Sequence, residues 1–158
     1  MTSHAHVAAG SLTRQAISAT LHCLTGCAIG EVLGVVIGTA LGLSAGVTIA
    51  LAIVLAFAFG YALTTRSVVR AGLGIKAAVG VALAADTLSI VTMEVVDNAV
   101  ILLVPGAMQA GLTSWLFWVS LAGALVIAFM VTVPVNRALL ARGKGHAVVH
   151  AAHGGHHH

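Results

Sequence analysis

Charge is what this sequence has least of. Of its 158 residues only 7% are Asp, Glu, Lys or Arg, whereas 59% are hydrophobic and the mean hydropathy is +1.08. A soluble domain carries about a quarter charged residues, so the composition excludes an ordinary soluble protein. Apolar runs of about 20 residues, the length that a helix needs to cross a bilayer, indicate an integral membrane protein made of helices.

Four apolar stretches predict four membrane-spanning helices in one all-α bundle. They cover approximately residues 17–43, 47–63, 77–104 and 115–135. We therefore divide the chain into an N-terminal arm (1–16), a four-span domain (17–137) and a His-rich tail (138–158). We expect no cleavable signal peptide, because the first 16 residues hold no long apolar region and the apolar run that follows is too long for one.

Basic residues are absent from two of the three connectors between these stretches, 44–46 and 105–114. All seven fall before the first span, between the second and third, or after the fourth: Arg14, Arg66, Arg70, Lys76, Arg137, Arg142 and Lys144. These segments share one side of the membrane, which the positive-inside bias places in the cytoplasm together with both termini. Because the basic residues lie in loops rather than on a patch, the net charge of +3 indicates no nucleic-acid partner.

Acidic residues are absent from every connector. All four lie inside predicted spans: Glu31, Asp86, Glu94 and Asp97. A carboxylate near the bilayer centre costs about 2.5–3.5 kcal/mol on insertion scales, so such groups mark ion pathways, proton relays or ligand sites. At about 100° per residue, the three acids of the third span share one helix face with Met93. The alternative is that these acids are protonated and only join helices by hydrogen bonds, although four acids with no exposed counterpart speak against it.

The first span carries a second stripe of polar and sulfur-bearing residues. Cys23, Cys27 and Glu31 follow one another at four-residue intervals, on successive turns of one helix face. Cysteine and methionine sulfur suit Cu(I) or Zn(II), whereas carboxylates suit harder ions or protons. The mixture favours a transition-metal path with thiolates in the cytoplasmic half and carboxylates further out. On the alternative interpretation the cysteines are small buried apolar residues. His22 is either a further ligand or an interfacial side chain that reaches the headgroups.

Glycine recurs along the same span at strict four-residue spacing, in the row Gly26, Gly30, Gly34, Gly38, Gly42 and Gly46. Small residues at this spacing let helix backbones approach closely in lipid. The row predicts tight packing, either within the bundle or between subunits, and it would bring the stripe of the first span toward that of the third. A four-span chain is small for a transporter, so we expect a homodimer or higher oligomer through this row.

A shift of 63 residues aligns Glu31 with Glu94 and Cys23 with Asp86. After the second span of each half, RSVVRAG resembles RALLARG. Two helical hairpins of like orientation would be related by an axis along the membrane normal, as in parallel-repeat transporters. The match is short, so chance similarity between apolar helices is the alternative to a duplication. Because the first and third spans also run outward from the same side and the glycines permit close approach, we expect Glu31 and Glu94 to face each other near or just outside the membrane centre.

Histidines are concentrated at both ends of the chain. Two histidines lie in the arm and six in the tail: His4, His6, His146, His150, His153, His156, His157 and His158. Short His-rich tracts are typical of metal binding, and in the cytosol they would capture an ion for efflux. The last three histidines can also be read as the remnant of a purification tag.

Pro134 predicts a break at the inner end of the fourth span, of the kind tolerated beside protein or a water-filled cavity.

Three motifs carry a resemblance to a known family: HCLTGCAIGEVLG (22–34), MEVVDNAVILLVPGAM (93–108) and VTVPVNRALLARGKGHAVVH (131–150). They resemble a family of small bacterial multi-spanning membrane proteins classed as a domain of unknown function. The resemblance covers approximately residues 21–150. It implies a place in the bacterial inner membrane and a single site formed by these polar residues, and it implies no substrate.

The sequence holds no nucleotide-binding loop and no Ser-His-Asp arrangement, so we do not expect an enzyme. The expected function is transmembrane handling of a transition-metal ion, Cu(I) or Zn(II), with efflux favoured over uptake. The expected path is lined by His22, Cys23, Cys27, Glu31, Asp86, Met93, Glu94 and Asp97. One alternative is a proton or monovalent-cation channel that uses only the carboxylates. Another is a non-transporting membrane subunit whose acids pair with a partner.

Overall fold

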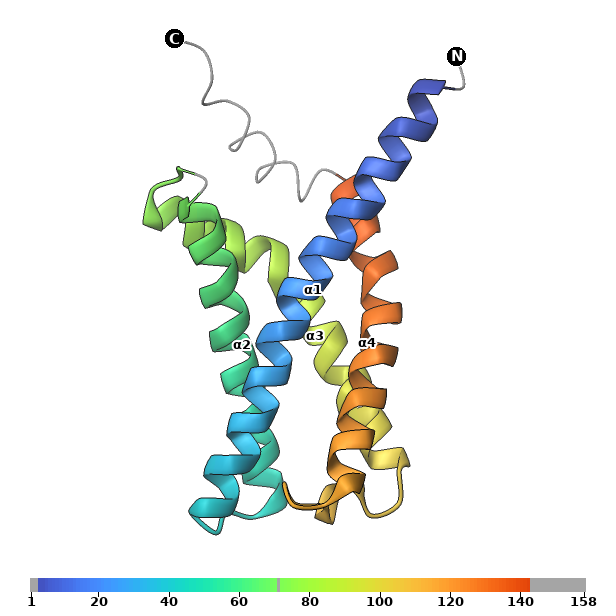
Figure 1. Cartoon of the computed structure of the whole chain (residues 1–158). Helices are drawn as coiled ribbons and strands as arrows, with labels where there is room; N and C mark the ends of the chain where they lie inside the picture. Colours follow the sequence, from blue (N-terminus) through green and yellow to red (C-terminus); the bar gives the residue numbers. More distant parts are fainter. Residues whose placement is uncertain (1–2, 71, 143–158) are drawn as a thin grey trace.

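Four long helices make up the fold (Figure 1). The structure, a computed structural model, describes residues 3–70 and 72–142, and these contain no strand. The helices are α1 (Ser3–Ala40), α2 (Ala45–Arg70), α3 (Ile75–Leu103) and α4 (Trp115–Ala141), with a short 3-10 helix η1 (Ala107–Gln109) before α4. Each contains an apolar stretch long enough to cross a membrane. The predicted all-α four-helix architecture is confirmed, and the apolar helices indicate a multi-pass membrane protein.

Several helix boundaries differ from those read off the sequence; α2, for example, ends at Arg70 rather than at residue 63. α1 begins at Ser3, so the segment assigned to an N-terminal arm continues the first helix, and residues 3–16 contain no proline to end it. α4 runs through Pro134 as far as Ala141, so the expected break at this proline is wrong. A membrane helix tolerates proline where neighbouring groups satisfy the backbone that it frees. The tail histidines, from His146 onward, lie outside the described residues.

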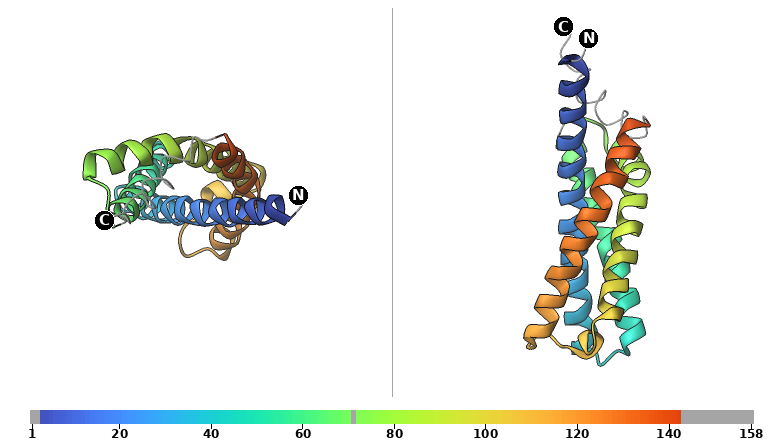
Figure 2. Two further views of the ribbon diagram at one scale, coloured as in Figure 1. Left: turned by 90° about the horizontal axis from the view of Figure 1, so that it is seen from above. Right: turned by 90° about the vertical axis from the view of Figure 1, so that its right-hand side faces the viewer.

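The four helices form two hairpins, α1 with α2 and α3 with α4, which pack side by side. The start of α1, the end of α4 and the turn between α2 and α3 lie at one end of the bundle, and the other two connectors lie at the opposite end (Figures 1 and 2). The first end carries Arg66, Arg70, Lys76, Arg137 and Arg142, and we call it the basic end. The opposite end, which holds residues 41–44 and 104–114, is called the neutral end.

α1 and α3 face each other across the centre of this arrangement. Each packs against both α2 and α4, while α1 and α3 contact each other over a shorter length. Side chains that point from α1 toward α3 therefore lie on the axis of the bundle. Both helices run from the basic end to the neutral end, so residues at corresponding positions lie at similar depth (Figure 1).

Glycines set the distance between α1 and α2. A Cβ atom on any of four glycines of the row would come within 2.7 Å or less of an atom of α2: Gly26, Gly30, Gly34 and Gly38. Gly30 is the tightest case, since its Cβ would lie 2.3 Å from the backbone nitrogen of Ala56. The expected tight packing is present, and it lies within the chain. These four glycines are covered by α2, so the expectation that the row joins two subunits is corrected.

The fifth glycine of the row ends α1 instead of packing. Gly42 has a φ of 64°, and its N–H donates to the Thr39 carbonyl at 3.2 Å, while the Leu43 N–H donates to the Gly38 carbonyl at 2.8 Å. This pair of bonds is a Schellman motif, whose left-handed residue is usually glycine because a Cβ is disfavoured there. The motif turns the chain sharply into α2 and so fixes the first hairpin.

The bundle is apolar outside and polar inside. Many large apolar side chains of the helices are exposed, among them Leu21, Val36, Val54, Leu88, Val119 and Met130. All four acidic residues of the chain are buried, as are five uncharged polar residues: Thr20, Ser89, Ser120, Thr132 and Asn136. An apolar surface of this kind matches lipid, and the polar chemistry of the protein is concentrated between its helices.

Candidate functional site

The residues singled out in the sequence lie mainly between α1 and α3. Seven of the eight are buried, with exposed fractions between 0 and 7%: Cys23, Cys27, Glu31, Asp86, Met93, Glu94 and Asp97. His22 is exposed on α1. Because α1 and α3 run in the same direction, the buried residues form layers along the bundle axis, described below from the basic end to the neutral end.

The first layer pairs a thiol with a carboxyl group. Cys23 of α1 lies next to Asp86 of α3, and Thr64 of α2 is a further neighbour of that carboxyl group. His22 lies within electrostatic reach of the same carboxyl, although its ring is at the surface. The Asp86 Oδ2 atom has no hydrogen-bond partner. Asp86 lines a cavity of about 50 Å³ together with Asn136 and apolar residues of α1, α3 and α4.

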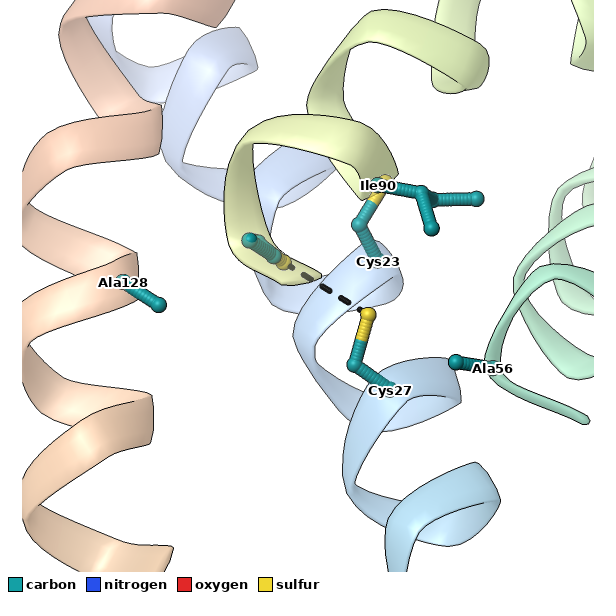
Figure 3. Packing of buried hydrophobic residues seen from close by; sticks show 6 residues of the cluster. Cys23, Cys27, Ala56, Ile90 and Ala128 are labelled. Atoms are coloured by element: carbon teal, nitrogen blue, oxygen red, sulfur yellow. Dashed lines mark hydrogen bonds between the residues drawn. The ribbon is translucent and has the colours of Figure 1, made fainter. Parts of the chain in front are cut away.

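The second layer brings two sulfur atoms together. The Sγ atom of Cys27 lies 3.9 Å from the Sδ atom of Met93, and neither side chain is exposed (Figure 3). Both cysteines are free thiols. Around this contact the helices pack into a buried cluster, which we call the sulfur plug: Cys23, Cys27, Ala56, Ile90, Met93 and Ala128. The plug fills the centre of the bundle, and Glu94 is the carboxyl group nearest to the Cys27 thiol.

The third layer is a cluster of three carboxyl groups. Glu31 of α1 lies beside Asp97 and Glu94 of α3, which also neighbour each other. The structure therefore brings Glu31 and Glu94 into one site, at the depth where the 63-residue alignment placed them. Outside this cluster and the Cys27 thiol, no donor reaches Glu31 Oε2, Glu94 Oε1 or either Asp97 oxygen. Carboxyl groups this close in a desolvated position cannot all be ionised unless a cation lies among them.

A larger cavity extends from the third layer to the neutral end. Its volume is about 280 Å³, and its lining comes from all four helices and from both connectors at that end. Glu31 and Glu94 lie at its deep end. No residue of the sulfur plug lines this cavity or the smaller one at Asp86. The plug therefore separates two cavities, each of which reaches at least one carboxyl group.

One polar network joins three helices and was not foreseen from the sequence. Asn136 of α4 donates through Nδ2 to Thr20 Oγ1 of α1 at 2.8 Å and accepts a hydrogen bond at Oδ1 from Ser89 Oγ of α3. Thr20 in turn donates to the Ala16 carbonyl at 2.7 Å. Asn136 also lines the cavity that Asp86 reaches. An asparagine in an otherwise apolar helix is the sequence signal that could have found this network.

Among the described residues, no three His, Cys, Asp or Glu side chains are arranged to hold one metal ion. The structure instead offers a series of pairs along the axis: Cys23 with Asp86, Cys27 with Met93, and Glu31 with Asp97. Successive positions with few ligands bind a moving ion weakly enough for it to leave, whereas a closed cage retains it. These pairs are the positions along the axis at which a cation could find ligands.

Comparison with known proteins assigns the chain to a family. Residues 13–145 match the family described as Domain of unknown function (DUF4396), and the chain belongs to it. The resemblance noted in the sequence is thereby confirmed. No curated protein matches the chain significantly, and no solved structure does. The family carries no assigned activity, so a function has to be argued from the residues themselves.

Proposed function

We propose that this protein moves a soft transition-metal cation, Cu(I) in the first place and Zn(II) in the second, across the bacterial inner membrane. The observation that carries the proposal is the contact of 3.9 Å between Cys27 Sγ and Met93 Sδ at the centre of the bundle. Thiolate and thioether ligands select Cu(I) among the metals available to proteins. Carboxyl groups lie on both sides of this contact, which gives the cation a compensating charge before and after it.

The proposed path follows the three layers. The ion passes from the Cys23–Asp86 pair to the Cys27–Met93 pair and then to the carboxyl cluster of Glu31, Glu94 and Asp97. Removing a charge from water costs several kcal/mol, so an ion can cross only where ligands replace its hydration shell. Each unpartnered carboxylate oxygen supplies one such ligand.

Copper is favoured over zinc by the number of ligands. Structural zinc is held by four ligands, and catalytic zinc by three from the protein. Within the part of the chain that the structure describes, no group of three His, Cys, Asp or Glu side chains is arranged to hold a metal ion. A thiol and a thioether that lie within reach of each other form a smaller, softer set, which suits Cu(I).

The proposed direction is efflux. The basic end carries five Arg and Lys residues of the described part of the chain, so the positive-inside bias supports a cytoplasmic location for this end and for both termini. The histidines of the tail would then face the cytosol and raise the local concentration of the ion. We also propose a homo-oligomer, formed through a surface other than the four glycines that α2 covers.

Metal stoichiometry on the purified protein tests this proposal. The full-length chain under reducing conditions should bind at least one Cu(I), and the double variant Cys23→Ser, Cys27→Ser should bind less by at least one equivalent. Both proteins carry the same terminal histidines, so their difference reports the thiols alone. Binding should weaken as the pH falls, because a thiol must lose its proton to bind metal. Equal Cu(I) binding by parent and double variant would refute the path.

The carboxyl cluster favours a second candidate, a proton channel. Glu31, Glu94 and Asp97 expose unpartnered oxygens to one another, as relays of carboxyl groups do. The two candidates differ in their need for sulfur. The test is proton flux into vesicles without added metal. A flux that Glu94→Gln abolishes and the double cysteine substitution does not change would favour the channel over the metal path.

A further inference from the structure

We propose that the cavity at the neutral end is a binding site for a small organic cation, an ammonium group carried on a compact apolar body. This goes beyond metal transport: the site shares Glu31 and Glu94 with the proposed metal path but uses none of its sulfur ligands. Neither cysteine and no other residue of the sulfur plug lines this cavity. The site is assembled from α1, α2, α3, α4 and the two connectors at the neutral end.

Three polar residues from three helices line the cavity. Glu31 comes from α1, Glu94 from α3 and Ser120 from α4. They are 7%, 6% and 7% exposed. Neighbouring buried carboxyl groups can ionise together only when a cation compensates their charge, so two of them in one cavity favour a cationic ligand. Ionised carboxylates only accept hydrogen bonds, so a ligand with N–H donors and positive charge matches them.

The walls of the cavity are apolar around these groups. They include Val35, Ile49, Ile53, Ile101, Phe117 and Leu121. A metal ion gains nothing from contact with such walls, because it binds through oxygen, nitrogen or sulfur ligands. An apolar body gains from them by leaving water, and ligand sites are typically lined in this way, with few polar groups to fix the orientation.

The size and position of the cavity define the ligand further. Its volume of about 280 Å³ lies just below the range of about 300–1,000 Å³ found for pockets of drug-sized molecules. The ligand is therefore a small amine. The lining extends from the two glutamates to Gln109 and Gly111 in the connector at the neutral end, so we expect the ligand to enter from that side.

Titration with benzylamine tests the site in the intact protein. Benzylamine is protonated at neutral pH, and benzyl alcohol has nearly the same shape without the charge. With the full-length chain in lipid nanodiscs, calorimetry should show saturable binding of benzylamine with about one equivalent per chain. Benzyl alcohol should show only the non-saturable uptake that lipid alone gives. Identical behaviour of the two probes would overturn the proposal without any variant.

Variants then locate the binding. Glu94→Gln and Glu31→Gln should each weaken benzylamine binding about tenfold or more, since a hydrogen bond to a charged group is lost. Asp86→Asn is the matched control on α3, because Asp86 faces the other cavity, and it should leave the affinity within about twofold. On α4, Ser120→Ala should weaken binding more than Thr132→Val, whose hydroxyl lines neither cavity. An equal loss in Asp86→Asn and Glu94→Gln would contradict the assignment.

The cysteines separate this inference from the proposed metal path. The double variant Cys23→Ser, Cys27→Ser should bind benzylamine as the parent does and lose Cu(I). Cu(I) binding without saturable benzylamine binding would refute the organic-cation site alone. Saturable benzylamine binding without Cu(I) binding would refute the metal path alone.

Discussion

Met93 and Met130 have the same side chain in opposite surroundings. Met93 is fully buried against Cys27 on the axis of the bundle, whereas Met130 of α4 is 60% exposed on the apolar outer surface. Leucine has a similar volume and no sulfur, so it keeps packing and removes only the thioether. The two methionines therefore offer a matched pair for asking whether the buried sulfur is a ligand.

Met93→Leu should lower the affinity for Cu(I) by about tenfold, the equivalent of about 1.4 kcal/mol, because one soft ligand is lost. Met130→Leu should leave that affinity unchanged. Competition against a Cu(I) chelator measures both. If the two substitutions have the same effect, Met93 is a core residue and nothing more.

Asn136 tests the polar network at the residue scale. Replacement by leucine removes the donor to Thr20 and the acceptor for Ser89, so two buried hydroxyl groups lose a partner. Hydrogen bonds between membrane helices average about 0.6 kcal/mol, so we expect Asn136→Leu to destabilise the fold by about 1–2 kcal/mol.

The control for Asn136→Leu is Thr132→Val, one turn earlier on α4. The Thr132 hydroxyl is buried without a hydrogen-bond partner, so its removal should be neutral or slightly stabilising. Thermal unfolding in one detergent ranks the two variants. A melting temperature that falls more in Thr132→Val than in Asn136→Leu would show that the network contributes little.

Residues of the site divide into those that the sequence reveals and those that it does not. Glu31 and Asp97 stand out because a charged residue in an apolar span is rare and helix periodicity gives its face. Thr20 and Ser120 do not stand out, because short hydroxyl side chains are common in membrane helices and bond their own backbone. Only the packing of a neighbouring helix decides which of them is buried. That information is tertiary and has no local signal.

At the scale of helices, the glycine row shows what spacing can predict. The four-residue period predicts that the face packs closely, because the period is a property of one helix. It does not identify the partner, which depends on how the chain folds back. The tight turn at Gly42 supplies that partner by laying α2 along α1. A short connector therefore predicts better than the glycine spacing whether such a row packs against a helix of the same chain or against another subunit.

Gly30→Ala should destabilise the α1–α2 hairpin. The added Cβ would lie 2.3 Å from the nitrogen and 2.5 Å from the Cα of Ala56, and backbone atoms cannot move aside without separating the helices. Overpacking of this kind costs about 1–3 kcal/mol. Unfolding in a detergent series measures the loss.

Gly123→Ala on α4 is the matched substitution, since a Cβ there has no atom within 4 Å. Alanine is the better helix former by about 0.5–1 kcal/mol, so this variant should be unchanged or more stable. Equal stability of the two alanine variants would mean that α1 and α2 are further apart than the structure has them.

The whole molecule is organised as two hairpins around an axis of sulfur and carboxyl groups. Composition and hydrophobic runs predict the number of helices, because a bilayer requires about 20 apolar residues for each crossing. Residues at corresponding positions of α1 and α3 lie at similar depth because both helices start at the basic end and run in the same direction. The two cavities and the plug between them could not be predicted, since they depend on how four helices tilt against one another.

Orientation in the membrane is a prediction for the whole chain. Because the Arg and Lys residues gather at the basic end, both termini should be cytoplasmic. A reporter that is active only in the periplasm, fused after His158, should be inactive, and a cytoplasmic reporter fused at the same place should be active. The reverse pattern would invert the proposed direction of transport.

Transport itself is the most direct measurement. The purified full-length chain is reconstituted into sealed vesicles that hold a Cu(I) chelator reporting on copper uptake, and Cu(I) is supplied outside under reducing conditions. The account predicts uptake by the parent protein, a rate at least about tenfold lower for Cys27→Ser and for Glu94→Gln, and an unchanged rate for Met130→Leu. Uptake no faster than in protein-free vesicles, or a rate that neither Cys27→Ser nor Glu94→Gln alters, would contradict the proposed path.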